Sequence, residues 1–136
     1  MTQAGAGTAA LVCLLLAGCT PPEPPCAAGT PAITAQLLFG RSIKGGGQVD
    51  AAAWQDFLAT VITPRFPDGL TILEARGQWR QRGTGRISAE ASTVVMIVTA
   101  PSPATTANLE AIRDDYRQRF NQDSVGLVVN HACAEF

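Results

Sequence analysis

The chain has 136 residues, of which 46% are hydrophobic, 6% aromatic and 15% charged. This length and composition suit one compact domain and exclude a multidomain enzyme. Ten basic and eleven acidic residues give a net charge of −1. That balance excludes a bulk electrostatic field that would draw the protein to nucleic acid or to an anionic membrane, so we expect no nucleic-acid partner.

Residues 8–17 read TAALVCLLLA, an apolar run with the length of a signal-peptide core and too short to span a bilayer. The run leads into Leu16-Ala17-Gly18-Cys19, which resembles the lipobox of bacterial lipoproteins. The resemblance implies a signal peptide over residues 1–18 and a lipid on the Cys19 thiol. The alternative is an apolar leader with a chance cysteine, since residues 1–7 lack the basic side chains that usually open a signal peptide.

A lipid on Cys19 implies an exported protein that the membrane holds through its N-terminus. Thr20, rather than aspartate, follows the cysteine, and in a Gram-negative cell this resembles the pattern of outer-membrane lipoproteins that face the periplasm. Residues 20–31 contain five prolines, which favour extended conformations. We interpret residues 19–31 as the lipidated cysteine and a stiff spacer, although Pro-rich segments also serve as ligands for partner proteins. The folded domain is expected over residues 32–136.

Six segments of the domain show a secondary-structure pattern, and in chain order they are a strand at 32–42, a helix at 51–63, strands at 71–80 and 93–99, a helix at 105–121 and a strand at 125–134. The first strand alternates, so Leu37 and Phe39 belong to one better-buried face. Asp50 is placed as the N-cap of the first helix, whose apolar residues recur at helical spacing.

Glycine and proline separate the segments. Pro64 and Pro67 are expected to end the first helix, and Gly83 and Gly85 mark a hairpin connection over residues 81–86. The strand at 93–99 is rich in β-branched residues and is therefore expected at the centre of the sheet. The order βαββαβ predicts a ferredoxin-like α+β sandwich, an antiparallel sheet of order 4-1-3-2 with both helices on one face.

This topology makes a prediction about the cysteines. Cys26 precedes the first strand, Cys133 ends the last, and the two strands are antiparallel neighbours in a 4-1-3-2 sheet. Export places the domain in an oxidising compartment, so a disulfide between Cys26 and Cys133 is expected. A metal site is not expected, because His131 is the only histidine.

Several motifs together resemble a bacterial domain-of-unknown-function family of small lipoproteins. The motifs are Phe39-Gly40-Arg41, Trp54 and Phe57, the block TPRFPDGLT at 63–71, Gly77-Gln78-Trp79, and the closing Ala132-Cys133 with Phe136. The resemblance covers residues 36–136, and the TPRFPDGLT block is its most specific part. It implies export and these domain boundaries, and it implies no activity or cofactor.

Three residues are candidates for chemistry. Arg41 heads a glycine-rich loop, where it would clamp a carboxylate or phosphate, or else cover the sheet edge. Arg65 and Asp68 would orient a ligand, or else Arg65 complements the carbonyl end of the first helix and Asp68 forms a turn. In each case the structural role is favoured.

The sheet face opposite the helices is the other candidate surface. Glu74, Arg76, Gln78 and Arg80 are expected on it from the strand at 71–80, and the strands at 32–42 and 93–99 can add Gln36, Leu38 and apolar residues. Faces of this kind are often buried by a second copy or by a partner. The leading hypothesis is therefore a non-enzymatic, lipid-anchored envelope protein that binds itself or an envelope partner through this face. The alternative is a small enzyme or ligand-binding protein with a cleft around Arg41, Arg65 and Asp68.

Overall fold

The computed structural model describes residues 26–136, so the expected signal peptide, Cys19 and most of the Pro-rich segment lie outside the described residues. The helices and strands in chain order are β1 (Thr30–Gly40), α1 (Ala51–Phe57), β2 (Thr71–Arg80), β3 (Ile87–Thr99), α2 (Pro103–Arg119) and β4 (Gly126–Ala134). After α1 the chain continues through a π-helical segment, Leu58–Ile62, and a 3-10 turn, Thr63–Arg65.

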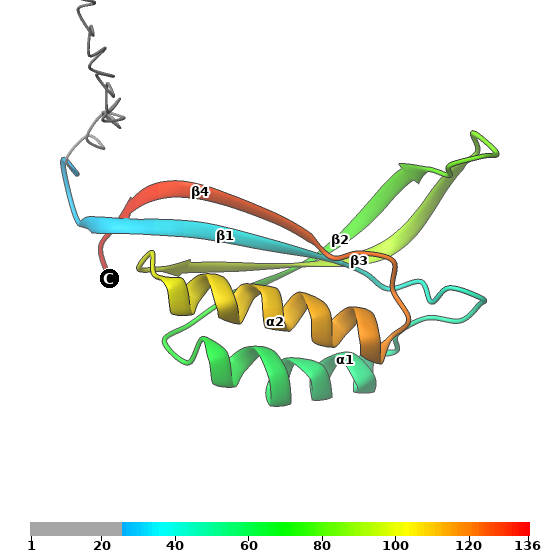
Figure 1. Cartoon of the computed structure of the whole chain (residues 1–136), viewed down its shortest axis with the longest axis horizontal. Helices are drawn as coiled ribbons and strands as arrows, with labels where there is room; N and C mark the ends of the chain where they lie inside the picture. The colour runs from blue at the N-terminus through cyan, green and yellow to red at the C-terminus, as the bar shows by residue number, and fades with distance from the viewer. Residues whose placement is uncertain (1–25) are drawn as a thin grey trace, which may run out of the picture.

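The four strands form one antiparallel sheet in the order β2-β3-β1-β4. Both helices lie against one face of this sheet, and no element of residues 26–136 covers the other face (Figure 1). The order is 4-1-3-2 when it is counted from β4. The ferredoxin-like fold predicted from the sequence is therefore confirmed.

Several boundaries differ from the expected ones, and two of the differences have a physical cause. Helical structure runs past Pro64, because proline is tolerated in the first turn of a new 3-10 segment and only at Phe66 does the backbone leave the helical region. The strand β3 begins at Ile87 rather than at residue 93, because residues 87–91 pair with β2, whereas β1 pairs only with residues 92–99.

The core lies between the helices and the inner face of the sheet. The side chains of Leu37 and Phe39 on β1 are fully buried, as their alternation predicts. The Phe39 ring packs edge-on against Trp54 and Phe57 of α1 and Tyr116 of α2, with ring centroids 4.7–6.2 Å apart. The Tyr116 hydroxyl donates a hydrogen bond of 2.8 Å to the carbonyl of Gly40, which ties α2 to the end of β1.

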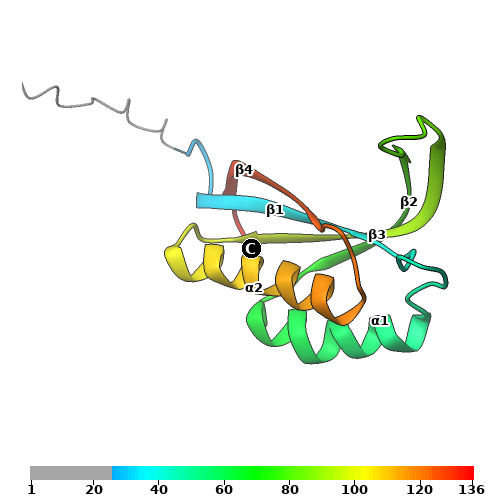
Figure 2. The same ribbon diagram turned by 45° about the vertical axis from the view of Figure 1, so that its right-hand side comes forward.

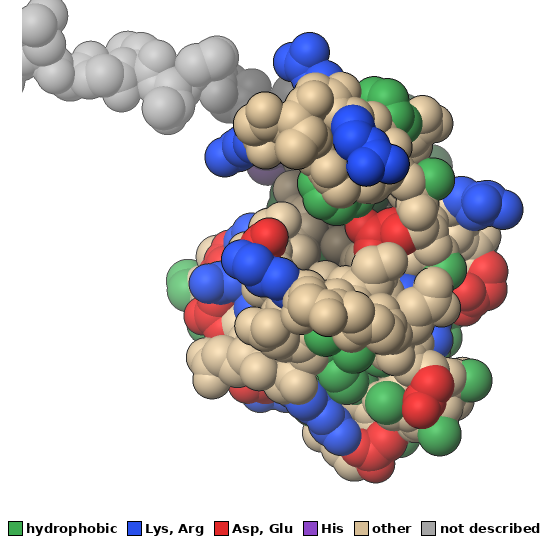
Figure 3. Space-filling model, turned by 90° about the vertical axis from the view of Figure 1, so that its right-hand side faces the viewer, with side chains coloured by type: hydrophobic (Ala, Val, Ile, Leu, Met, Phe, Trp, Pro, Cys, Tyr) green, Lys and Arg blue, Asp and Glu red, His purple; other side chains and the backbone are tan. Residues whose placement is uncertain are grey.

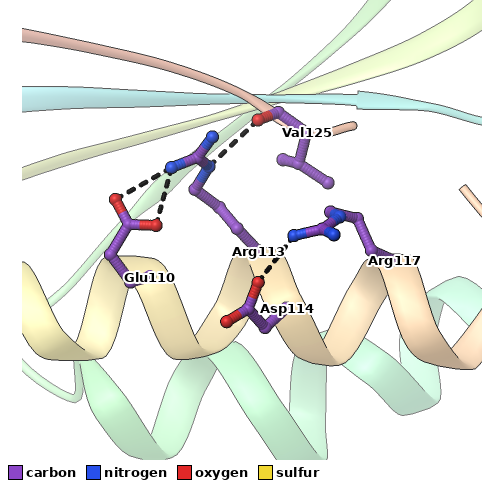
Figure 4. A network of polar contacts seen from close by, with 5 residues as sticks. All are labelled: Glu110, Arg113, Asp114, Arg117 and Val125. Atoms are coloured by element: carbon purple, nitrogen blue, oxygen red, sulfur yellow. Dashed lines mark hydrogen bonds and ion pairs between the residues drawn. The ribbon is translucent and has the colours of Figure 1, made fainter. Parts of the chain in front are cut away.

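Capping and charge pairing fix the helices. The Asp50 carboxylate accepts a hydrogen bond of 2.8 Å from the backbone N–H of Ala53, so Asp50 is the N-cap that the sequence predicts. On α2, Arg113 pairs with Glu110 and also donates a 3.0 Å hydrogen bond to the Val125 carbonyl (Figure 4). This arginine therefore holds α2 to the connection that leads into β4.

The disulfide predicted from the topology is present. Cys26 is bonded to Cys133 with a Cα–Cα distance of 5.6 Å, across 107 residues of sequence. Three residues after Cys26, Gly29 adopts a φ of +74°. A Cβ at this position would lie 2.3 Å from the Ala134 carbonyl oxygen. Only glycine allows the incoming chain to pass so close to β4.

The β2–β3 hairpin extends beyond the helices. Residues 76–80 pair with residues 87–91 and with no other strand of the described chain. We call residues 76–91 the arm. Figures 1 and 2 show that the arm projects past the end of α1 and curls to the side of the sheet that faces away from the helices. A two-stranded ribbon of this kind is only marginally stable in water when nothing packs on it.

Candidate functional site

The open face is the sheet surface that faces away from the helices, and on it apolar side chains lie beside uncharged polar ones such as Gln36 and Asn130. The strand register assigns to it Leu38 of β1, Leu73 of β2 and Val128 of β4, with exposed fractions of 39%, 51% and 46%. Half-buried Val94 and Met96 of β3 lie between them. Contiguous exposed apolar side chains of this kind are typical of interaction surfaces.

The polar residues of β2 are on the other side of the sheet from the expected one. Ile72 pairs with the buried Val95 and packs against the core, so every second residue from Ile72 shares the helix side. These residues are Glu74, Arg76, Gln78 and Arg80, and their assignment to the open face was wrong. They remain exposed because most of them belong to the arm, which runs past the helices.

One carboxylate lies on the open face, and it accepts hydrogen bonds from within the chain. Glu90 of β3 accepts hydrogen bonds from the Trp79 indole at 3.1 Å and from the Ser42 backbone N–H at 2.9 Å. Its oxygens occupy the space that a side chain on Gly40 would need, since a Cβ there would lie 2.9 Å from them. Gly40 therefore lets Glu90 join β3, the arm and the loop after β1.

Arg41 is held by the protein itself. Its Nε donates to the Val49 carbonyl at 2.9 Å, its Nη1 donates to the Thr93 hydroxyl at 3.2 Å, and its guanidinium lies 5.4 Å from the centroid of the Trp54 ring. Arg41 therefore joins the end of β1 to the start of α1, and within residues 26–136 it neither pairs with an acid nor lies at an edge strand of the sheet.

Arg65 and Asp68 lie away from Arg41. Arg65 donates to the Val61 carbonyl at 2.8 Å and pairs with Asp115 of α2 at 3.0 Å, as expected for a cation at the carbonyl end of a helix. Arg65 and Asp68 line an open groove of about 370 Å³, whose other lining residues come from the start of β1, the end of β3, α2 and the C-terminus, and Arg41 is not among them. The expected cleft around all three residues is therefore wrong, since Arg41 lies at the start of the α1 helical run and Arg65 at its end.

A family model matches residues 34–136, almost the whole described domain, and its description is "Protein of unknown function (DUF3574)". The chain belongs to this family. Membership confirms the family of unknown function that the FGR and TPRFPDGLT motifs indicated, while the lipoprotein part of that resemblance stays a prediction. It assigns no activity to this DUF3574 protein. No curated protein matches the chain.

Solved structures share the fold at low sequence identity. A phage SAM lyase in complex with S-methyl-5′-thioadenosine aligns with a TM-score of 0.58 and 18% identity over 77% of this chain and 92% of the lyase chain. CutA1 from Oryza sativa aligns with a TM-score of 0.53 and 11% identity over 78% of this chain and 84% of its own. At such identities the likeness concerns the fold alone.

In residues 26–136, no three His, Cys, Asp or Glu side chains are grouped as metal ligands. The same residues contain no helix that is both long and apolar enough to cross a membrane.

Proposed function

We propose that this DUF3574 protein is a non-enzymatic interaction module of the bacterial cell envelope, anchored by a lipid on Cys19, and that its open face binds a second copy of the chain. The apolar part of the open face is the observation that carries the proposal. Its exposed leucine and valine side chains lie on both edge strands and on β1, so the apolar surface extends across the sheet.

The charge distribution on the open face favours a second copy over a charged partner. Glu90 is the one charged side chain that the described strands place there, and both of its oxygens accept hydrogen bonds within the chain. Two such faces therefore carry one carboxylate each and no other charge. An isologous contact between identical faces is also the commonest arrangement in homo-oligomers.

Neighbouring valines on β4 provide a matched test. Val128 lies on the open face and Val129 on the helix side, with exposed fractions of 46% and 45%. In the chain lacking residues 1–18 and carrying Cys19→Ser, we expect Val128→Glu to weaken self-association at least tenfold, because it buries a charge in the apolar contact.

Sedimentation velocity over a range of protein concentrations measures this effect. The control, Val129→Glu, adds the same charge on the other side of the strand and is expected to associate like the parent chain. Equal association of the two variants would contradict the proposal, and so would a parent chain that is monomeric at every concentration.

The lipid anchor has its own test, on the full chain expressed in a bacterium that processes lipoproteins. We expect the intact mass of the chain extracted from membranes to correspond to a start at Cys19 with added acyl chains. Cys19→Ser should abolish both the processing and the added mass, whereas Cys13→Ser, within the apolar run, should retain them. Unmodified chain in the membrane, or lipid on the Cys19→Ser variant, would refute the anchor.

A further inference from the structure

The arm carries a concentrated positive charge. Four arginines of the arm are exposed, namely Arg76, Arg80, Arg82 and Arg86. Their guanidinium groups make no ion pair and no hydrogen bond within residues 26–136. The one acid of the arm, Glu90, is bonded to Trp79 and Ser42. Figure 3 faces this end of the molecule and shows basic side chains over its upper part, which the arm forms.

The other basic residues of the chain are already neutralised or enclosed. Arg41 is half-buried, and the remaining five each pair with a carboxylate, namely Lys44, Arg65, Arg113, Arg117 and Arg119. Four unpaired cations on one ribbon are therefore a local feature of the arm. The net charge of −1 conceals it, because the acids lie mostly on the rest of the domain.

The arginines are spread along the ribbon rather than gathered in a pocket. We call the side of the arm that is opposite Trp79 its outer side. Arg76 and Arg80 lie on this side, where Arg80 pairs across the ribbon with Ile87, whose side chain is 58% exposed. Arg82 and Arg86 lie in the connection between the strands. The two cavities described at other parts of the domain include no residue of the arm. An extended anionic surface fits this arrangement better than a small anion does.

We infer that the arm binds an anionic lipid surface. Arginines next to an exposed isoleucine match the chemistry of a membrane interface, where phosphate groups lie beside acyl chains. The inference goes beyond the proposed function and does not depend on the open face, because the basic outer side of the arm is the opposite side of the ribbon from Trp79.

Vesicle binding tests the inference with the full chain carrying Cys19→Ser. We compare the partitioning of this chain into vesicles of phosphatidylcholine alone with its partitioning into vesicles of equal parts phosphatidylcholine and phosphatidylglycerol. Any contribution of the apolar run at residues 8–17 then appears with both kinds of vesicle. Each arginine near an anionic surface changes partitioning by about fivefold. Arg82→Gln with Arg86→Gln should therefore lower the preference for anionic vesicles by about thirtyfold.

The control variant removes the same charge from α2, with Arg117→Gln and Arg119→Gln, and should keep the preference of the parent chain. High salt should abolish the preference, because ions screen exposed charges. No anionic preference in the parent chain, or an equal loss in both double variants, would overturn the inference. Binding to polyglutamate or to DNA in place of the vesicles would also overturn it, since the partner would then be an acidic protein or a nucleic acid. Sedimentation of the arm variant separates this result from the proposed function, because its self-association should be unchanged.

Discussion

Replacing Cys26 and Cys133 with serine is expected to lower the free energy of unfolding by about 4–5 kcal/mol, the largest loss of stability that we predict for this chain. The disulfide joins residues 107 positions apart, and in the chain-entropy model a cross-link over so long a loop removes much of the freedom of the unfolded chain. It also fixes the segment around Gly29 against the end of the edge strand β4, where the fit is too close for any side chain.

Denaturant unfolding of the double serine variant, followed by far-UV circular dichroism, measures the loss. Reduction of the parent chain is the natural control and should produce a similar shift in the midpoint. Single variants should resemble the double variant, since either one removes the cross-link. A loss below about 1 kcal/mol would show that the unfolded chain gains little freedom when the bond is absent.

The second large effect is a loss of stability at alkaline pH through Tyr116. Burial against the aromatic core raises the pKa of Tyr116 from 10.0 to about 12, while nearby Arg41 lowers this pKa and Glu90 raises it. The folded chain therefore keeps the phenol protonated where the unfolded chain has begun to lose the proton. The stabilisation is complete below pH 10 and disappears between pH 10 and about pH 12, a change on the order of 3 kcal/mol.

Tyr116 is the only tyrosine, so ultraviolet absorbance of the phenolate follows this residue alone. We expect the absorbance of the folded chain to rise with a midpoint well above pH 10, and the free energy of unfolding to fall over the same range. The variant Tyr116→Phe keeps the ring in the core and removes the titration, so its stability should depend much less on pH. A phenolate midpoint near pH 10 in the folded chain would contradict the burial of the hydroxyl.

Much of the fold could be predicted because local and long-range signals agree. The alternation around Phe39 identifies a strand with one buried face, and the structure buries that face. The element order allows few topologies, and the correct one placed Cys26 beside Cys133. Pattern and topology together therefore predicted a contact between residues at opposite ends of the domain.

The side of β2 could not be predicted from alternation alone. A period of two separates Ile72 and Glu74 from Leu73 and Trp79, and the second set is the more apolar, so the pattern favours burial of Leu73 and Trp79, whereas the structure packs Ile72 against the core. Which set faces the helices depends on where β2 runs past them, and only the tertiary structure shows this. Consequently the open face is more apolar than expected, and Arg76, Gln78 and Arg80 belong to the arm.

The contacts of Glu90 and the charge of the arm also escaped sequence reasoning. Glu90 precedes the expected strand at 93–99, and only the long pairing of β3 with β2 brings it beside Trp79 and Ser42. The net charge suggested no electrostatic partner, because an average over the chain hides four arginines in one ribbon. A count of charge over residues 76–86 alone would have found them.

In our proposal a second copy of the chain covers the open face, and photo-crosslinking in intact cells detects that contact where it forms. A photoreactive amino acid is placed at position 128 in the otherwise unchanged chain, with position 129 as the matched control on the other side of β4. Irradiation at position 128 should yield a product with the mass of two chains, and position 129 should yield little of it. A product at position 128 that contains a different protein, or no product at all, would rule out a second copy as the partner of this face.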